Sequence, residues 1–96
     1  ITGGGITENL PRIMPEGVSA EIDFSSWDMP LLFWWLQETG QIEFKEMLRT
    51  FNCGIGMVAV TPVEEAEKVI QILAENDLKA FNIGKVIRGS KVKFKF

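Results

Sequence analysis

The sequence predicts an α+β fold in which a mixed β-sheet is covered by helices. Strand-like segments alternate with amphipathic segments, in the order strand, helix, short helix, strand, helix, strand, strand. One crossover helix and a closing hairpin place both parallel and antiparallel pairs in one sheet. With 96 residues, 46% of them hydrophobic, the chain is expected to form a single domain, 1–96.

The first strand is expected at Val18–Phe24, where apolar and polar residues alternate, as in a strand with one buried face. A helix should follow, because Pro30 suits a first helical turn and Gly40 suits the position after a helix that runs to about Thr39.

The apolar residues of this helix, Leu31–Leu36, surround its axis. A helix that is apolar on every side is buried on more than one side. We therefore expect Trp34 and Trp35 in core or interface packing, against a missing region or a partner, rather than stacked on nucleic-acid bases.

The central part of the chain predicts a short helix at Glu43–Arg49 and a strand at Ile55–Val60. The strand is nearly continuously apolar, which is typical of a central strand covered on both faces. The next helix should begin in a capping box, with Thr61 as N-cap, Pro62 at N1 and Glu64 at N3. It carries an apolar stripe and should end near residues 76–77.

A strand at Ala80–Arg88, with a bulge at Gly84, and a two-residue turn at Gly89-Ser90 are expected near the end of the sequence. In Lys91–Phe96, lysines alternate with apolar residues. This pattern favours a lysine-protected edge strand over an RNA-binding strand.

Composition excludes several classes of function. The net charge of −3 argues against nucleic-acid binding, and no apolar run approaches the length of a membrane span. The single cysteine, Cys53, forms no internal disulfide and indicates a reducing, cytoplasmic location; we expect a buried free thiol. Without histidine, a Ser-His-Asp triad and the usual zinc sites are excluded, so we predict no catalytic residue and no metal ligand.

The glycine run Gly3, Gly4 and Gly5, preceded by Thr2, allows a ligand to approach the backbone closely. A loop of this kind that enters a helix can hold phosphate on its N–H groups. The spacing matches neither the dinucleotide fingerprint nor a P-loop, so a plain flexible turn and a phosphate cradle both stay open. For Glu8, a helix-capping role is favoured over acid–base catalysis.

Arg49 and Asn52 flank a loop between a helix and an apolar segment. Arg49 can bind a phosphate in bidentate fashion, and Asn52 can both donate to and accept from an amide. The structural alternative is that Arg49 caps its helix and Asn52 closes an Asx turn. The sequence leaves these two interpretations open.

Two long motifs, ITGGGITENLPRIMPEG and EMLRTFNCGIGM, resemble the phosphoribosylformylglycinamidine cyclo-ligase family, that is, the aminoimidazole ribonucleotide synthetases. SSWDMPLLFWWLQETGQIEFKEM and KAFNIGKVIRG extend the resemblance to about Gly89. It implies the latter part of a C-terminal domain with partial ferredoxin-like topology.

The resemblance also implies a reaction: closure of the imidazole ring of formylglycinamidine ribonucleotide with ATP and Mg²⁺. Thr2–Gly5 and Asn9 would contact substrate or phosphate, and Arg49 and Asn52 would line the same cleft. ATP and Mg²⁺ would be bound mainly by an N-terminal domain that also forms a homodimer and is absent here.

The chain has no initiator Met and starts beside its glycine run, so we expect a fragment that is inactive by itself. In the family, a histidine precedes the matching run. Two alternatives stay open: a fragment of a related enzyme (formylglycinamidine ribonucleotide synthetase or a selenophosphate synthetase-like protein), and a non-catalytic phosphometabolite-binding module.

Overall fold

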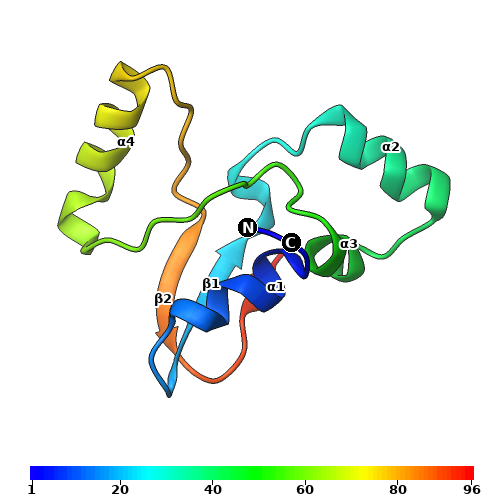
Figure 1. The fold of residues 1–96 in the computed structure, drawn as a ribbon. Coiled ribbons are helices and arrows are strands. Elements are labelled where there is room, and N and C mark those ends of the chain that lie inside the picture. Colours follow the sequence, from blue (N-terminus) through cyan, green and yellow to red (C-terminus); the bar gives the residue numbers. More distant parts are fainter.

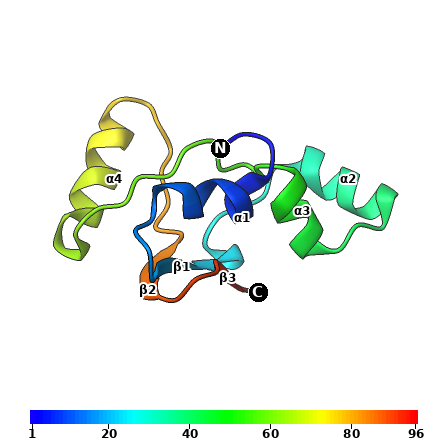
Figure 2. The ribbon, with the colours of Figure 1, turned by 60° about the horizontal axis from the view of Figure 1, so that its bottom comes forward.

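The computed structural model describes residues 1–96 and confirms the α+β class with a mixed sheet. The central strand is β1 (Val18–Asp23), which pairs antiparallel with β2 (Gly84–Arg88) and parallel with β3 (Lys93–Lys95). The two flanking strands therefore both come from the end of the chain, while the central strand comes from its first quarter (Figure 2).

The buried face of β1 follows from its alternating sequence. Ala20 and Ile22 are 4% and 3% exposed. Helix α1 (Gly5–Asn9) and the 3-10 turn η1 (Leu10–Ile13) lie over the sheet (Figure 2) and add Ile6 and Leu10 to the same core cluster. Ser19, expected on the solvent face, is also buried.

The core continues from the sheet into α3 (Phe44–Thr50), which packs against α1. Met47 and Leu48 are fully buried there. The ten residues of the core are Ile6, Leu10, Ala20, Ile22, Trp27, Met29, Met47, Leu48, Cys53 and Ile55. They join the glycine run, the first strand and α3 into one hydrophobic unit.

Helix α2 (Leu31–Gly40) begins directly after Pro30, close to the predicted start. Its end differs from the prediction, which placed Gly40 after the helix. Gly40 is the last helical residue, and Gln41 takes the left-handed conformation at φ 50°. The Gln41 N–H donates to the Glu38 carbonyl, and the Gln37 side chain donates to the Ile42 carbonyl at 2.8 Å. These bonds hold Gln41 in a conformation that glycine adopts more easily.

The predicted strand at Ile55–Val60 is wrong. This segment is extended but belongs to no sheet. Met57 is 88% exposed, so the segment is not covered on both faces as a central strand would be. Its Gly56 carbonyl instead accepts a hydrogen bond from the backbone nitrogen of Ile1 at 2.6 Å.

The predicted capping box at Thr61–Glu64 is also wrong. A 3-10 turn, η3 (Val63–Glu65), precedes α4 (Ala66–Glu75), and neither has a side-chain cap. The Thr61 hydroxyl contacts the Pro62 carbonyl instead of a helical N–H. The helix ends as expected near residues 76–77, but it stands apart from the sheet (Figures 1 and 2), and none of its residues is buried.

The predicted hairpin at Gly89-Ser90 is wrong, because β2 and β3 flank β1 instead of pairing with each other. The bulge at Gly84 is wrong as well: its register with Ile22 continues the ladder, and a side chain there would meet the Glu21 backbone. The lysine-protected edge strand is confirmed, since Lys93 and Lys95 of β3 are exposed. No helix has both the length and the apolar character needed to cross a membrane.

Candidate functional site

The glycine run turns sharply into α1. Gly4 has φ 97° and Gly5 has φ 60°, in the region that side chains rarely adopt. Gly5 also lies against the end of α3: an added Cβ would overlap the Leu48 carbonyl oxygen and lie 2.7 Å from that of Phe51. Two independent constraints, backbone conformation and close approach, therefore require glycine at this position.

This contact brings together the two segments that the sequence singled out. The Thr7 hydroxyl donates to the Leu48 carbonyl at 3.3 Å, one residue before Arg49. The glycine loop and the end of α3 are therefore neighbours in the fold, and their contact lies in the core, where Gly5 and Leu48 are buried.

The Asn9 side chain is hydrogen-bonded to the backbone of the glycine loop. Its side-chain nitrogen lies 2.8 Å from the Gly5 carbonyl, 3.1 Å from that of Thr2 and 3.2 Å from that of Gly3. Its oxygen accepts from the Thr2 hydroxyl at 3.1 Å. These bonds fix the shape of the loop, so the position of any ligand there depends on Asn9 even without direct contact.

The N–H groups of Gly3 and Gly4 have no hydrogen-bond partner within the chain. Gly3 is exposed, and a Cβ added there would meet no heavy atom within 4 Å. Free donors beside open space can accommodate an anion. The Glu8 side chain lies over Gly4 but makes no capping hydrogen bond, so the predicted capping bond is absent.

Arg49 pairs with Glu46 on the same helix, with 3.2 Å between nitrogen and oxygen, and half or more of each side chain is exposed. It caps no carbonyl. Asn52 accepts a hydrogen bond from the Gly54 N–H at 2.8 Å, which is the Asx turn of the structural alternative. The Arg49 guanidinium is held only by an exposed pair, which costs little to break.

Comparison with known proteins decides the family. The family model described as "AIR synthase related protein, C-terminal domain" matches residues 1–96. The chain belongs to this AIR synthase related C-terminal domain family.

Relatives of this family agree with the motifs. The chain is 52% identical over 84 residues to the phosphoribosylformylglycinamidine cyclo-ligase of Neisseria meningitidis serogroup C, covering 88% of the chain and 24% of that protein. It is 52% identical over 86 residues to the protein of the same name from Chromobacterium violaceum, covering 90% and 25%. The predicted resemblance is confirmed, and the chain spans about a quarter of the length of these curated relatives.

Within this AIR synthase related domain, Arg12, which the sequence did not single out, lies beside the glycine loop. Its guanidinium lies 3.4 Å from the Asn9 side-chain oxygen and places a second cation near the glycine loop. The available signal was its position three residues after Asn9 in a helical segment, which puts the two side chains on one face.

Cys53 is confirmed as a buried free thiol. Its Sγ donates to the Met47 carbonyl at 3.4 Å, and burial raises its pKa from the usual 9.0 to about 11. A thiol that stays protonated is a poor nucleophile. Cys53 therefore belongs to the core of the domain and not to its reactive groups.

Proposed function

We infer that this chain is the C-terminal, substrate-binding part of an ATP-dependent cyclo-ligase. The whole enzyme would convert formylglycinamidine ribonucleotide to aminoimidazole ribonucleotide, releasing ADP and phosphate, in de novo purine biosynthesis in the cytoplasm. The family match over residues 1–96 and the names of the relatives support this proposal. Because the chain spans about a quarter of those relatives, we assign ATP, Mg²⁺ and the homodimer contact mainly to residues outside it.

The observation that carries the proposal is the contact of the glycine loop with the end of α3. Gly5 lies against the Leu48 and Phe51 carbonyls, so the two segments of the proposed cleft are adjacent in the fold. The free N–H groups of Gly3 and Gly4 offer donors to a phosphate, and Arg49 offers a fork of donors once it leaves Glu46.

Ring closure of this kind depends on positioning and charge stabilisation more than on a nucleophile. The task of this chain would be to hold the ribonucleotide: Thr2–Gly5 at the phosphate, Asn9 as the support of that loop, and Arg49 and Asn52 along the same cleft. No three Cys, Asp or Glu side chains gather as a metal site, and we propose no Mg²⁺ ligand here. Alone, the chain should not turn over substrate.

A chimaeric enzyme tests the proposal. Residues 1–96 replace the matching segment of the Neisseria meningitidis cyclo-ligase, and ADP formation is measured with formylglycinamidine ribonucleotide and ATP. We expect activity within about tenfold of the parent, because the two segments are 52% identical. A folded chimaera that does not form aminoimidazole ribonucleotide contradicts the cyclo-ligase assignment and favours the related synthetases or a non-catalytic binding module.

Matched arginine variants of the chimaera test the site itself. Arg49→Ala should raise the KM for the ribonucleotide by about tenfold or more, the value of one charge-assisted contact. Arg88→Ala, on β2 and exposed, serves as control and should leave the KM unchanged. Equal effects of the two substitutions contradict the placement of Arg49 in the substrate cleft.

A further inference from the structure

The extended segment Ile55–Val60 leaves the core after its first residue. Ile55 is 7% exposed, whereas Met57 is 88% and Val60 49% exposed. The backbone N–H and carbonyl groups of residues 57–60 make no hydrogen bond within the chain, and the outer edges of β2 and β3 do not pair with them. The segment therefore presents a row of free backbone donors and acceptors beside apolar side chains.

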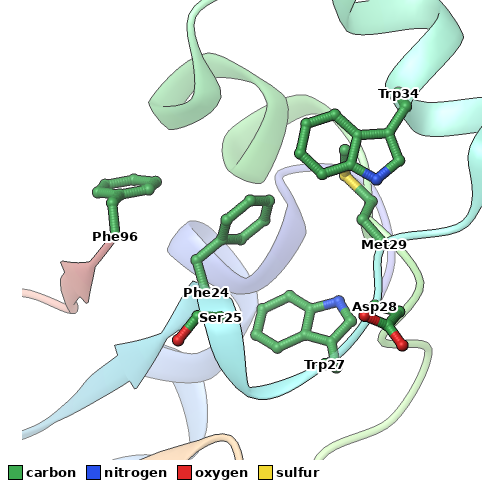
Figure 3. A pocket seen from close by; sticks show the side chains of 7 residues that line it. All are labelled: Phe24, Ser25, Trp27, Asp28, Met29, Trp34 and Phe96. Atoms are coloured by element: carbon green, nitrogen blue, oxygen red, sulfur yellow. The ribbon is translucent and has the colours of Figure 1, made fainter.

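This free segment differs from other surfaces of the chain. At the edge of the sheet, the exposed lysines of β3 place charges beside the free backbone groups, which is a common protection against further pairing. Between β1 and α2, the rings of Phe24 and Trp27 pack against one another, with 5.3 Å between their centroids (Figure 3). No charged residue lies between Arg49 and Glu64, so the free segment has neither charges nor packed rings to cover it.

One hydrogen bond shows which part of a longer chain can reach the segment. The backbone nitrogen of Ile1 lies 2.6 Å from the Gly56 carbonyl oxygen, and the start of the chain lies beside the segment in both views (Figures 1 and 2). Bonds between backbone N–H and carbonyl groups are the units of a β-ladder. On one side of Gly56, Cys53 is fully buried and its carbonyl already accepts from Trp27. Free partners for a second strand therefore exist only on the other side, at residues 57–60.

Helix α4, which follows the segment, also lacks a partner. Its apolar stripe includes Val69, Ile70 and Leu73, but none of its residues is buried. A helix that follows a strand normally covers the sheet to which that strand belongs. The free segment and the stripe of α4 therefore lack the same thing, which is a sheet.

We propose that Ile55–Val60 becomes a strand in the full-length enzyme, paired with the residues that directly precede Ile1 there. This inference rests on the proposed function, which makes the chain a part of a longer enzyme; the chain covers 24% and 25% of the curated relatives. The pairing would continue the contact between Ile1 and Gly56 along residues 57–60 and would bury Met57. Because Ile1 leads into the glycine run, the same pairing would hold the proposed phosphate loop from its N-terminal side.

Hydrogen exchange measures this pairing in the chimaera described above, with the isolated 96-residue chain as the reference. The amides of residues 57–60 should exchange at least about a hundredfold more slowly in the chimaera. The Asp23 amide, which donates to the Ile83 carbonyl at 2.8 Å, reports folding and should be protected in both proteins. Unchanged exchange at residues 57–60 in a folded chimaera overturns the inference. A chimaera that does not fold also overturns it, because the preceding residues of the host then fail to complete the sheet.

A second copy of the chain is the competing occupant of the segment. Protection of residues 57–60 that rises with the concentration of the isolated chain, together with a dimer in analytical ultracentrifugation, overturns the inference and assigns the segment to that contact. The result is also separable from the proposed function. A chimaera that forms aminoimidazole ribonucleotide while residues 57–60 stay unprotected retains the function and overturns the pairing, whereas a protected segment in a folded but inactive chimaera supports the pairing and contradicts the function.

Matched lysine substitutions test the burial of the segment. Met57→Lys should not change the melting temperature of the isolated chain, in which this side chain is 88% exposed. In the chimaera it should lower the melting temperature by about 5 °C or more, because the new charge would be buried. Ser90→Lys, at an exposed position between β2 and β3, is the control and should change neither protein. An unchanged melting temperature of the chimaera with Met57→Lys overturns the inference.

Discussion

The backbone of Gly5 lies directly against the carbonyl of Leu48, in a space that admits no side chain. This relationship joins the glycine loop to the end of α3, and the geometry of the proposed substrate site depends on it. Neither residue carries a functional group, yet their contact aligns the two segments that do.

We predict that Gly5→Ala destabilises the chain by about 3 kcal/mol. The new Cβ would overlap the Leu48 oxygen and would force an alanine to φ 60°, and each of these costs free energy. Urea denaturation followed by circular dichroism measures the loss. Gly3→Ala is the control in the same loop, because open space surrounds Gly3; comparable losses in the two variants would contradict the close-contact explanation.

Replacement of Asn9 should loosen the loop without removing any charge. Asn9→Asp places a carboxylate oxygen where the amide nitrogen now faces the Thr2, Gly3 and Gly5 carbonyls. We expect a loss of about 2 kcal/mol in the free energy of unfolding, with faster hydrogen exchange at residues 2–6. Asn82→Asp, an exposed position without a hydrogen bond of its own, should cost less than about 0.5 kcal/mol. An unaltered exchange rate in Asn9→Asp would contradict the supporting role of Asn9.

The fold class, β1, α2 and α3 were predictable from local patterns. These patterns are the alternation in β1, Pro30 before α2, and apolar residues at helical spacing in α3. The predictions that were wrong concern pairing between parts of the chain that are distant in sequence. The apolar run Ile55–Val60 has the composition of a central strand, but the central position of the sheet is taken by β1, between β2 and β3. Similarly, the Gly89-Ser90 pair looks like a hairpin turn, although the chain crosses from one side of β1 to the other.

The sequence named candidate residues for the site but did not predict the contacts that their side chains make. The resemblance pointed to Asn9, and the structure places its side chain inside the loop, bonded to the loop's own carbonyls. Sequence spacing does not reveal such bonds, since they depend on the positive φ angles of Gly4 and Gly5. Arg12 was missed for a different reason: its contact with Asn9 follows from their spacing of three residues, but that spacing does not show that Asn9 belongs to the loop.

The buried thiol predicts a loss of stability at alkaline pH. Because the folded pKa of Cys53 is raised from 9.0 to about 11, the unfolded chain releases its thiol proton first as the pH rises. The protonated Cys53 thiol contributes fully to the free energy of unfolding below pH 9.0. This contribution is lost as the pH rises through about 11. We expect a decrease of roughly 2 kcal/mol across this window, measured by urea denaturation at each pH. The same series with Cys53→Ala should lack this component; a parallel decline in both proteins would assign the effect to other groups.

Trp27 and Trp35 should differ sharply in their contribution to stability. Trp27 is 5% exposed and donates to the Cys53 carbonyl, whereas Trp35 is 60% exposed on α2. Trp27→Phe leaves that buried carbonyl without its donor and should cost about 2 kcal/mol, while Trp35→Phe should stay within about 0.5 kcal/mol. Urea denaturation of the two variants makes the comparison, and acrylamide should quench the emission of the Trp27→Phe variant more strongly than that of Trp35→Phe. If Trp35→Phe proved the more destabilising, α2 would pack against the rest of the chain through its Trp35 face, contrary to the observed exposure of that side chain.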